Sequence, residues 1–224
     1  MPGKLTYNSY GKSRVRLTKV IRNGNVHDLF ELNADIQLEG DFEPAYTAGD
    51  NRNVVATDTV KNTVYVIAKE NAFDSVEAFS VLLARHFLKT YPHVSAALVE
   101  LTQDSWRRID VSGKPHDHAF VDAGAHKRIA IAKLARNGQA PSITGGVRGL
   151  KVIKTTASEW RDFHTDRYRT LKDTSDRILG TTIDATWACR TDADYNKSFD
   201  AITRAMLETF ATQHSLGRSR RSCI

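Results

Sequence analysis

The chain has 224 residues, of which 41% are hydrophobic and 26% are charged, and its formal net charge is +6. This length suits one large or two small globular domains, and no apolar run is long enough to cross a bilayer. The basic residues are scattered among acidic ones, and two cysteines make no disulfide framework, so we expect a cytoplasmic protein that binds neither nucleic acid nor membrane.

The first part of the sequence predicts a β-hairpin followed by a loop. Residues 15–21 and 29–38 are rich in β-branched side chains, and Asn23-Gly24 between them is a strong hairpin signal. Residues 42–53 are polar and contain glycine and proline, which is typical of a loop.

A helix and two long strands are predicted next. Asp74 is placed to cap the helix, and Glu77 is placed to complete a reciprocal capping box. Apolar residues then recur at helical spacing: Val76, Phe79, Leu82, Leu83, Phe87 and Tyr91. Residues 94–109 and 120–134 predict two strands, joined by a turn-prone segment.

The same order begins again after Asn137-Gly138 but stops early. Residues 150–155 and 183–187 predict strands, and residues 198–213 predict a helix with one apolar face. The first unit, residues 1–137, therefore has two strands, a helix and two strands, whereas the second unit, residues 138–216, has only two strands and a helix. We expect the shortened second unit to expose a sheet edge and to leave its helix partly uncovered. The basic residues 217–224 show no periodicity, and we interpret them as an aberrant tail produced by a frame-shift or truncation.

Three short motifs carry groups suited to chemistry. They are Tyr10-Gly11-Lys12, Ala56-Thr57-Asp58 and Asp176-Arg177. Taken singly, each is a common surface feature, because a lysine near a strand is usually solvated and a Thr-Asp pair usually forms a turn or cap. Their significance depends on their occurring together.

Together the motifs resemble the urate oxidase (uricase) family over about residues 10–215. The stretches that carry the resemblance follow the family's order: YGKSRVRLTKV, NVVATDTVKNTVYVIAKE, GKPHDHAF, GLKVIKTTAS and TLKDTSDRILGTTIDATW. The resemblance implies an α+β protein with two tunnelling-fold (T-fold) units, each an antiparallel sheet with helices on one face, of which the second is incomplete here. It also implies a homotetramer with sites at subunit interfaces. The family uses no cofactor when it oxidises urate with dioxygen to 5-hydroxyisourate and hydrogen peroxide in purine catabolism.

The resemblance assigns roles to five residues. Lys12 and Thr57 match the catalytic lysine and threonine that form a proton relay with a histidine. Thr57 and Asp58 are expected to contact the edge of the purine. Arg177 matches the arginine that grips urate, since its planar fork offers paired donors to an anionic ring. Trp160 matches the residue that stacks on urate, a position where phenylalanine is common.

Several residues of the family's site have no match in this sequence. The glutamine that pairs with urate aligns near Ser219, inside the unrelated tail, and the dioxygen-binding asparagine and the relay histidine belong still later. We therefore expect this polypeptide to fold poorly or aggregate and to oxidise urate negligibly. The alternative is a non-catalytic T-fold subunit or a purine-binding remnant.

A zinc-dependent pterin enzyme of the same fold is a third hypothesis. His116 and His118 alternate along a predicted strand and could face the same side. Two ligands are too few for a zinc site, so we predict no metal.

Overall fold

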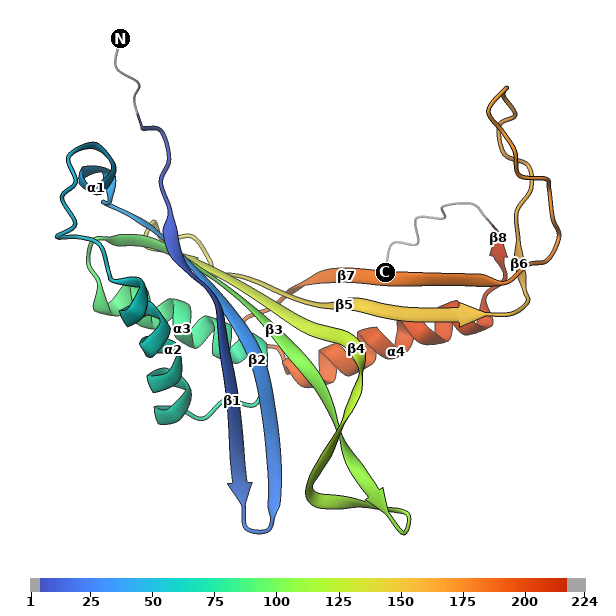
Figure 1. Cartoon of the computed structure of the whole chain (residues 1–224), viewed down its shortest axis with the longest axis horizontal. Helices are drawn as coiled ribbons and strands as arrows, with labels where there is room; N and C mark the ends of the chain where they lie inside the picture. Colours follow the sequence, from blue (N-terminus) through green and yellow to red (C-terminus); the bar gives the residue numbers. More distant parts are fainter. Residues whose placement is uncertain (1–4, 217–224) are drawn as a thin grey trace.

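The computed structural model describes residues 5–216 and contains one continuous six-stranded antiparallel sheet (Figure 1). The strands follow the order β1-β2-β3-β4-β5-β7, and β6 and β8 form a short parallel pair. The elements are β1 (Tyr10–Asn23), β2 (Val26–Gly40), α1 (Glu43–Thr47), α2 (Thr57–Glu70), α3 (Val76–Thr90), β3 (Val94–Val111), β4 (Lys114–Ala135), β5 (Ser142–Lys154), β6 (Ser158–Glu159), β7 (Leu179–Cys189), α4 (Tyr195–Thr212) and β8 (Ser215–Leu216). The predicted α+β class is confirmed.

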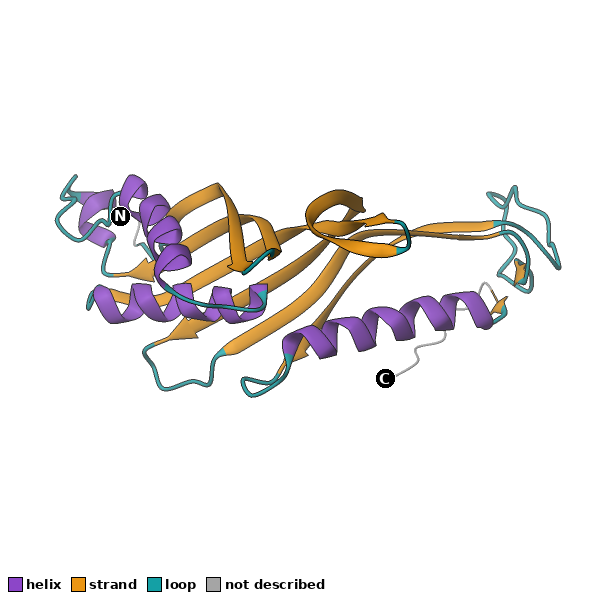
Figure 2. Cartoon of the chain, turned by 90° about the horizontal axis from the view of Figure 1, so that it is seen from below, coloured by secondary structure: helices purple, strands orange, loops and turns teal. Residues whose placement is uncertain are grey.

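The helices cover one face of the sheet, as the edge-on view in Figure 2 shows for α3 and α4. The alternation of β2 explains this, because Leu32, Ala34, Ile36 and Leu38 are fully buried and successive strand residues point to opposite faces. These side chains pack in one cluster with the apolar residues of α2 and α3. None of the helices in residues 5–216 is both long and apolar enough to span a membrane.

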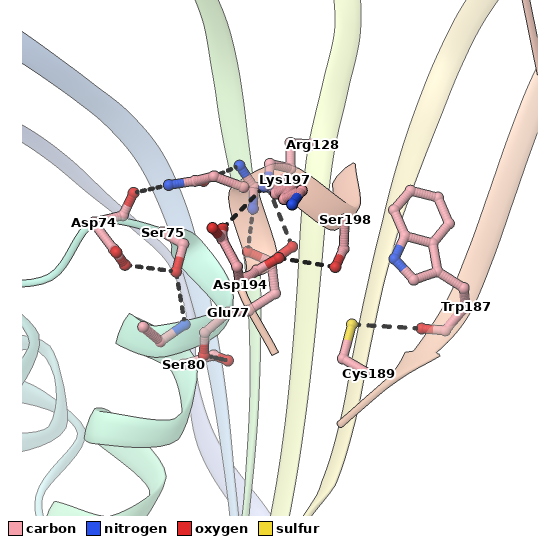
Figure 3. A network of polar contacts seen from close by, with 12 residues as sticks. Asp74, Ser75, Glu77, Ser80, Arg128, Trp187, Cys189, Asp194, Lys197 and Ser198 are labelled. Carbon is pink, nitrogen blue, oxygen red and sulfur yellow. Dashed lines mark hydrogen bonds and ion pairs between the residues drawn. The ribbon is translucent and has the colours of Figure 1, made fainter. Parts of the chain in front are cut away.

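A largely buried ion pair joins α3 to β4, and its arginine also reaches α4 (Figure 3). Arg128 of β4 donates to Glu77 of α3 at 3.1 and 2.6 Å, and the Glu77 side chain is only 1% exposed. Arg128 also donates to the side-chain oxygen of Asn196 at 2.7 Å, and its guanidinium lies 4.5 Å from the ring centroid of Phe199. Asn196 in turn donates to the carbonyl of Asp74 at 2.9 Å. One arginine thus connects α3, β4 and the first turns of α4.

The start of α3 differs from the prediction. Ser75, not Asp74, is the N-cap, and its hydroxyl accepts a hydrogen bond from the backbone N–H of Ala78 at 3.3 Å. The carboxylate of Glu77 binds Arg128. In a capping box, that carboxylate would accept a hydrogen bond from a backbone N–H at the helix start. Here it binds the Arg128 guanidinium instead.

Two helices lie where none was predicted. The segment predicted as a loop contains the short helix α1, and residues 57–70 form α2, which was not predicted. The signal for α2 was present, because its buried residues Val60, Val64, Ile67 and Ala68 recur at helical spacing. The hairpin at Asn23-Gly24 is confirmed, and Gly24 has a φ of +63°, which glycine adopts readily.

The second unit has the free edge that its sequence predicts. Within residues 5–216, β7 pairs only with β5, and α4 contains no buried residue. The sheet also continues across the predicted boundary at residues 137–138, because β4 pairs with β5 in register from Lys127↔Arg148 to Lys133↔Ser142. The predicted tail, residues 217–224, lies outside the described residues.

We expect Glu77→Gln to lower the free energy of unfolding by about 3 kcal/mol, because it leaves the buried Arg128 guanidinium without its counter-charge. Urea unfolding followed by circular dichroism measures this change. Glu100→Gln is the matched control, since its partner Arg148 is 50% exposed, and surface pairs contribute less than about 1 kcal/mol. Equal effects of the two substitutions would contradict the role of the buried pair.

Candidate functional site

Lys12 lies near the start of β1, where the strand is irregular. A side chain at Gly11 would place its Cβ 1.8 Å from the carbonyl oxygen of Ile36, so only glycine allows this close approach. The register of β1 shifts directly after Lys12, and Arg14 in the bulge has a φ of +59° while its N–H donates to Asp35 at 2.7 Å. Such a bulge redirects the neighbouring side chains, and Lys12 is left half-buried at the sheet margin.

Thr57 and Asp58 are the first residues of α2, and both are exposed. The Lys61 ammonium hydrogen-bonds to Asp58 at 2.5 Å and is the main cause of the lowered pKa of that carboxyl. The positive charge of Lys12 makes a smaller contribution in the same direction. Lys12, Thr57 and Asp58 form one group, because α2 packs against β1.

The hydroxyl of Tyr10 ties the two segments of this group together. It accepts from the backbone N–H of Val55 at 2.6 Å and lies 3.2 Å from the Val55 carbonyl, to which it donates. Its ring packs edge-on against Phe42 with centroids 4.6 Å apart, and burial raises the pKa of Tyr10. Tyr10 is two residues before Lys12, and Val55 is two residues before Thr57, so this contact joins the two segments that carry the candidate catalytic residues.

A second group forms around Trp160. The guanidinium carbon of Arg177 lies 5.0 Å from the Trp160 ring centroid, and the Phe163 ring stacks on the indole at 4.0 Å with 20° between the planes. The residue before Arg177 anchors this segment, because the Asp176 carboxylate accepts from the Thr156 hydroxyl at 2.8 Å. This hydroxyl holds the pKa of the Asp176 carboxyl below its usual range, and desolvation opposes the effect.

The Trp160 group contains an unmet hydrogen-bond donor. Arg177 Nε is buried and has no hydrogen-bond partner within residues 5–216. A cavity of about 250 Å³ adjoins the group, and its lining is mostly aromatic: Trp160, Phe163, His164, Tyr168, Arg169, Thr170 and Leu171. A flat anion suits such surroundings, because a guanidinium supplies paired donors and an indole supplies a face for stacking.

The two groups cannot meet within one copy of the chain. Pairing across the sheet aligns Lys12 with Ile143 of β5 through Ile36, Val99 and Ala132. Eleven residue steps of β5 separate Ile143 from Lys154, and at about 3.3 Å each they place the Trp160 end of the sheet on the order of 35 Å away. Figure 1 shows α2 at one end of the molecule and β6 at the other. The five predicted site residues therefore form two separate half-sites.

His116 and His118, the two histidines that suggested zinc, lie near the tip of the β3–β4 hairpin, and His27 at the tip of the β1–β2 hairpin lies close to them. The rings of His116 and His118 have centroids 4.6 Å apart, and His27 lies 5.6 Å from His118. Within residues 5–216, no group of three or more His, Cys, Asp or Glu side chains is arranged to hold a metal ion. The predicted position of the family's glutamine, near Ser219, lies outside the described residues.

Sequence reasoning missed the residues that support these half-sites. The Tyr10 hydroxyl binds the backbone of Val55, which is distant in the sequence. The Asp176 carboxylate binds Thr156, on the other side of a loop. The only available signal was their position inside the motifs that carry Lys12 and Arg177.

Comparisons with known proteins agree with the motifs. The uricase family model matches residues 8–133 and 143–220. The uricase of Arthrobacter globiformis is 42% identical over 213 residues, covering 95% of this chain and 68% of the relative, and that of Dictyostelium discoideum is 38% identical, covering 93% and 73%. The crystal structure of the Arthrobacter uricase superposes with a TM-score of 0.89 at 40% identity, covering 96% of this chain and 73% of that one.

We expect Tyr10→Phe to raise the hydrogen-exchange rate of the Val55 amide roughly fivefold to tenfold, because the amide loses an acceptor worth about 1 kcal/mol. The ring contact with Phe42 is retained, so the fold survives. Tyr46→Phe is the control, because it also removes a hydroxyl that donates to a backbone carbonyl, that of Ser9, but on an exposed side chain. An unchanged Val55 rate in Tyr10→Phe would refute the clamp.

Proposed function

The chain belongs to the uricase family, and we propose that it is a urate oxidase subunit whose two half-sites act on urate across a contact between copies. In this arrangement Lys12, Thr57 and Asp58 of one copy face Trp160 and Arg177 of a second copy. The proposal rests on one observation. Two family motifs, each suited to a flat anion, lie too far apart in one chain to contact the same ligand.

Each half-site would supply a different part of the chemistry. Arg177 would bind adjacent acceptors of urate through its paired N–H groups, and Trp160 would offer its ring face. Lys12 would take a proton from urate, with the Thr57 hydroxyl passing it on, because a hydroxyl both donates and accepts. Loss of protons makes urate electron-rich. Urate then gives two electrons to dioxygen, and addition of water completes 5-hydroxyisourate and hydrogen peroxide without a cofactor.

The proposed assembly is a homotetramer of chains with two T-fold units, residues 1–137 and 138–216. Support comes from the edge strand β7 and from α4, which has no buried residue within the described part of the chain. Both features offer surface for further association. Exposure of Thr57 and Asp58 in a single copy also fits a site that is completed by another copy.

The described residues hold only part of the site that the resemblance implies. The chain spans 68% of the Arthrobacter uricase and 73% of the Dictyostelium uricase. The resemblance puts the family's glutamine, asparagine and relay histidine beyond the described residues. Loss of one hydrogen-bonding group from such a site costs on the order of a hundredfold in rate. We therefore use urate binding as the first readout and peroxide formation as the second.

Mixing two defective variants tests the shared site. We expect Lys12→Met and Arg177→Met each to abolish urate binding, and a mixture refolded together at equal amounts to recover about a quarter of the sites. This fraction follows because each site draws one half-site at random from each of two copies, and each half-site is intact half of the time. Equilibrium dialysis with urate measures the recovery.

A second mixture is the matched control. Lys12→Met mixed with Thr57→Ala should recover nothing, since both substitutions damage the same half-site and no pairing restores it. Peroxide formed in proportion to recovered binding would support the oxidase, and binding without peroxide would indicate a purine-binding subunit. No recovery in the first mixture, although the unchanged chain binds urate, would contradict a site shared between copies.

A further inference from the structure

We propose that Arg169 is a positioning residue for the aromatic platform of the urate site. It would act through Phe163, whose ring lies against Trp160, because its nitrogens already bind groups of the loop. The inference rests on the proposed function for its link to urate, but its structural part concerns only the orientation of Trp160 and stands on the contacts of the loop from Trp160 to Thr174.

The guanidinium of Arg169 is the centre of this loop. Its Nε donates to the carbonyl of Leu171 at 3.1 Å, and one terminal nitrogen donates to the Thr165 hydroxyl at 2.8 Å and to the carbonyl of Phe163 at 3.4 Å. The other terminal nitrogen forms an ion pair with Asp173. The Arg169 side chain is only 20% exposed. All three of its nitrogens are therefore used inside the loop.

The loop closes at the residue that is expected to stack on urate. Trp160 and Thr174 exchange two backbone hydrogen bonds, each of 2.8 Å, which fix the two ends of the loop side by side. Between these ends, Phe163 is the residue whose ring lies parallel to the indole. Arg169 connects the Phe163 carbonyl with Asp173, the residue directly before Thr174. It thus fixes Phe163 relative to the point where the loop closes.

Two ring contacts of the indole are seen in the described residues. One contact with its ring comes from Phe163, and another comes from the guanidinium of Arg177, which a bound anion would recruit. A ring that stacks on a flat ligand must hold its plane, and packing by supporting residues is what holds it. Phe163 is therefore the fixed side of the platform, and Arg169 is the residue that keeps Phe163 in place.

Only an arginine suits this position. Its rigid fork offers donors to four acceptors in different directions, whereas the compact ammonium of a lysine cannot span them. Arg169→Lys keeps the positive charge near Asp173 and removes the fork. Arg167→Lys is a matched control, because Arg167 contacts the ring and hydroxyl of Tyr168 and, among residues 5–216, forms no hydrogen bond with Phe163.

The experiment reports on Trp160 directly. Trp106→Phe and Trp187→Phe leave Trp160 as the only tryptophan, since the chain has three. In this background we expect Arg169→Lys to shift the emission to longer wavelength and to increase quenching by acrylamide. We also expect urate to bind about two- to tenfold more weakly, the value of one aromatic contact. Arg167→Lys should change neither signal.

Hydrogen exchange in the chain with all three tryptophans provides a second measurement that needs no tryptophan substitution. The amides of Trp160 and Thr174 should exchange faster in Arg169→Lys, while those of β2 and β3 keep their rates and show that the fold is intact. The proposal would be overturned if Arg169→Lys left the Trp160 emission and the amide exchange unchanged. It would also be overturned if Trp160 became more mobile in this variant while the affinity for urate stayed the same. If the unchanged chain binds no urate, the proposed function is wrong, and the Trp160 signals alone decide the role of Arg169.

Discussion

The unbroken backbone pairing from β1 to β7 is the constraint on which the rest of the molecule depends. A register is a fixed relation, because a slip by one residue would turn every side chain to the opposite face. Once Lys12 is opposite Ile36 and that row continues to Ile143, the length of β5 sets how far Trp160 lies from Lys12. The sheet places the two candidate half-sites at its two ends, and this separation is the basis of the proposal that a site is shared between copies.

A sheet of this length needs its helices fixed to it, and Arg128 does this where the two units meet. Its partner Glu77 is almost completely buried, so the pair tolerates the loss of neither member. Arg128 also reaches Asn196 and Phe199, which hold the first turns of α4. Beyond those turns the helix has no buried residue in the described structure. Arg128 therefore holds the start of α4, whereas Lys154 of β5 holds its other end, where it lies 5.4 Å from the Phe210 ring centroid and donates to the carbonyl of Gln213 at 2.7 Å.

The sequence predicted what depends on local pattern. Asn23-Gly24 predicted a hairpin because two residues suffice to set its turn, and the helix after Ser75 was predicted from its apolar stripe. Its cap was predicted wrongly, because the carboxylate of Glu77 is claimed by Arg128, fifty-one residues later. The separation of Lys12 from Trp160 was not predictable either. It follows from the pairing of β4 with β5, which no local pattern encodes.

Each half-site keeps hydrogen-bond donors open to a ligand. Arg177 Nε is a buried donor without a partner in the described residues, and such a group costs about 1–3 kcal/mol. No side chain caps α2 at Ala56, so its first N–H groups remain available beside Lys12. Both ends thus keep donors that an anion would satisfy. Four residues support the segments that carry these donors. They are Gly11 and Tyr10 in the Lys12 half-site, and Asp176 and Arg169 in the Trp160 half-site. A binding site needs rigid support around its unpaired donors before the ligand binds. Each end of the sheet has such support of its own.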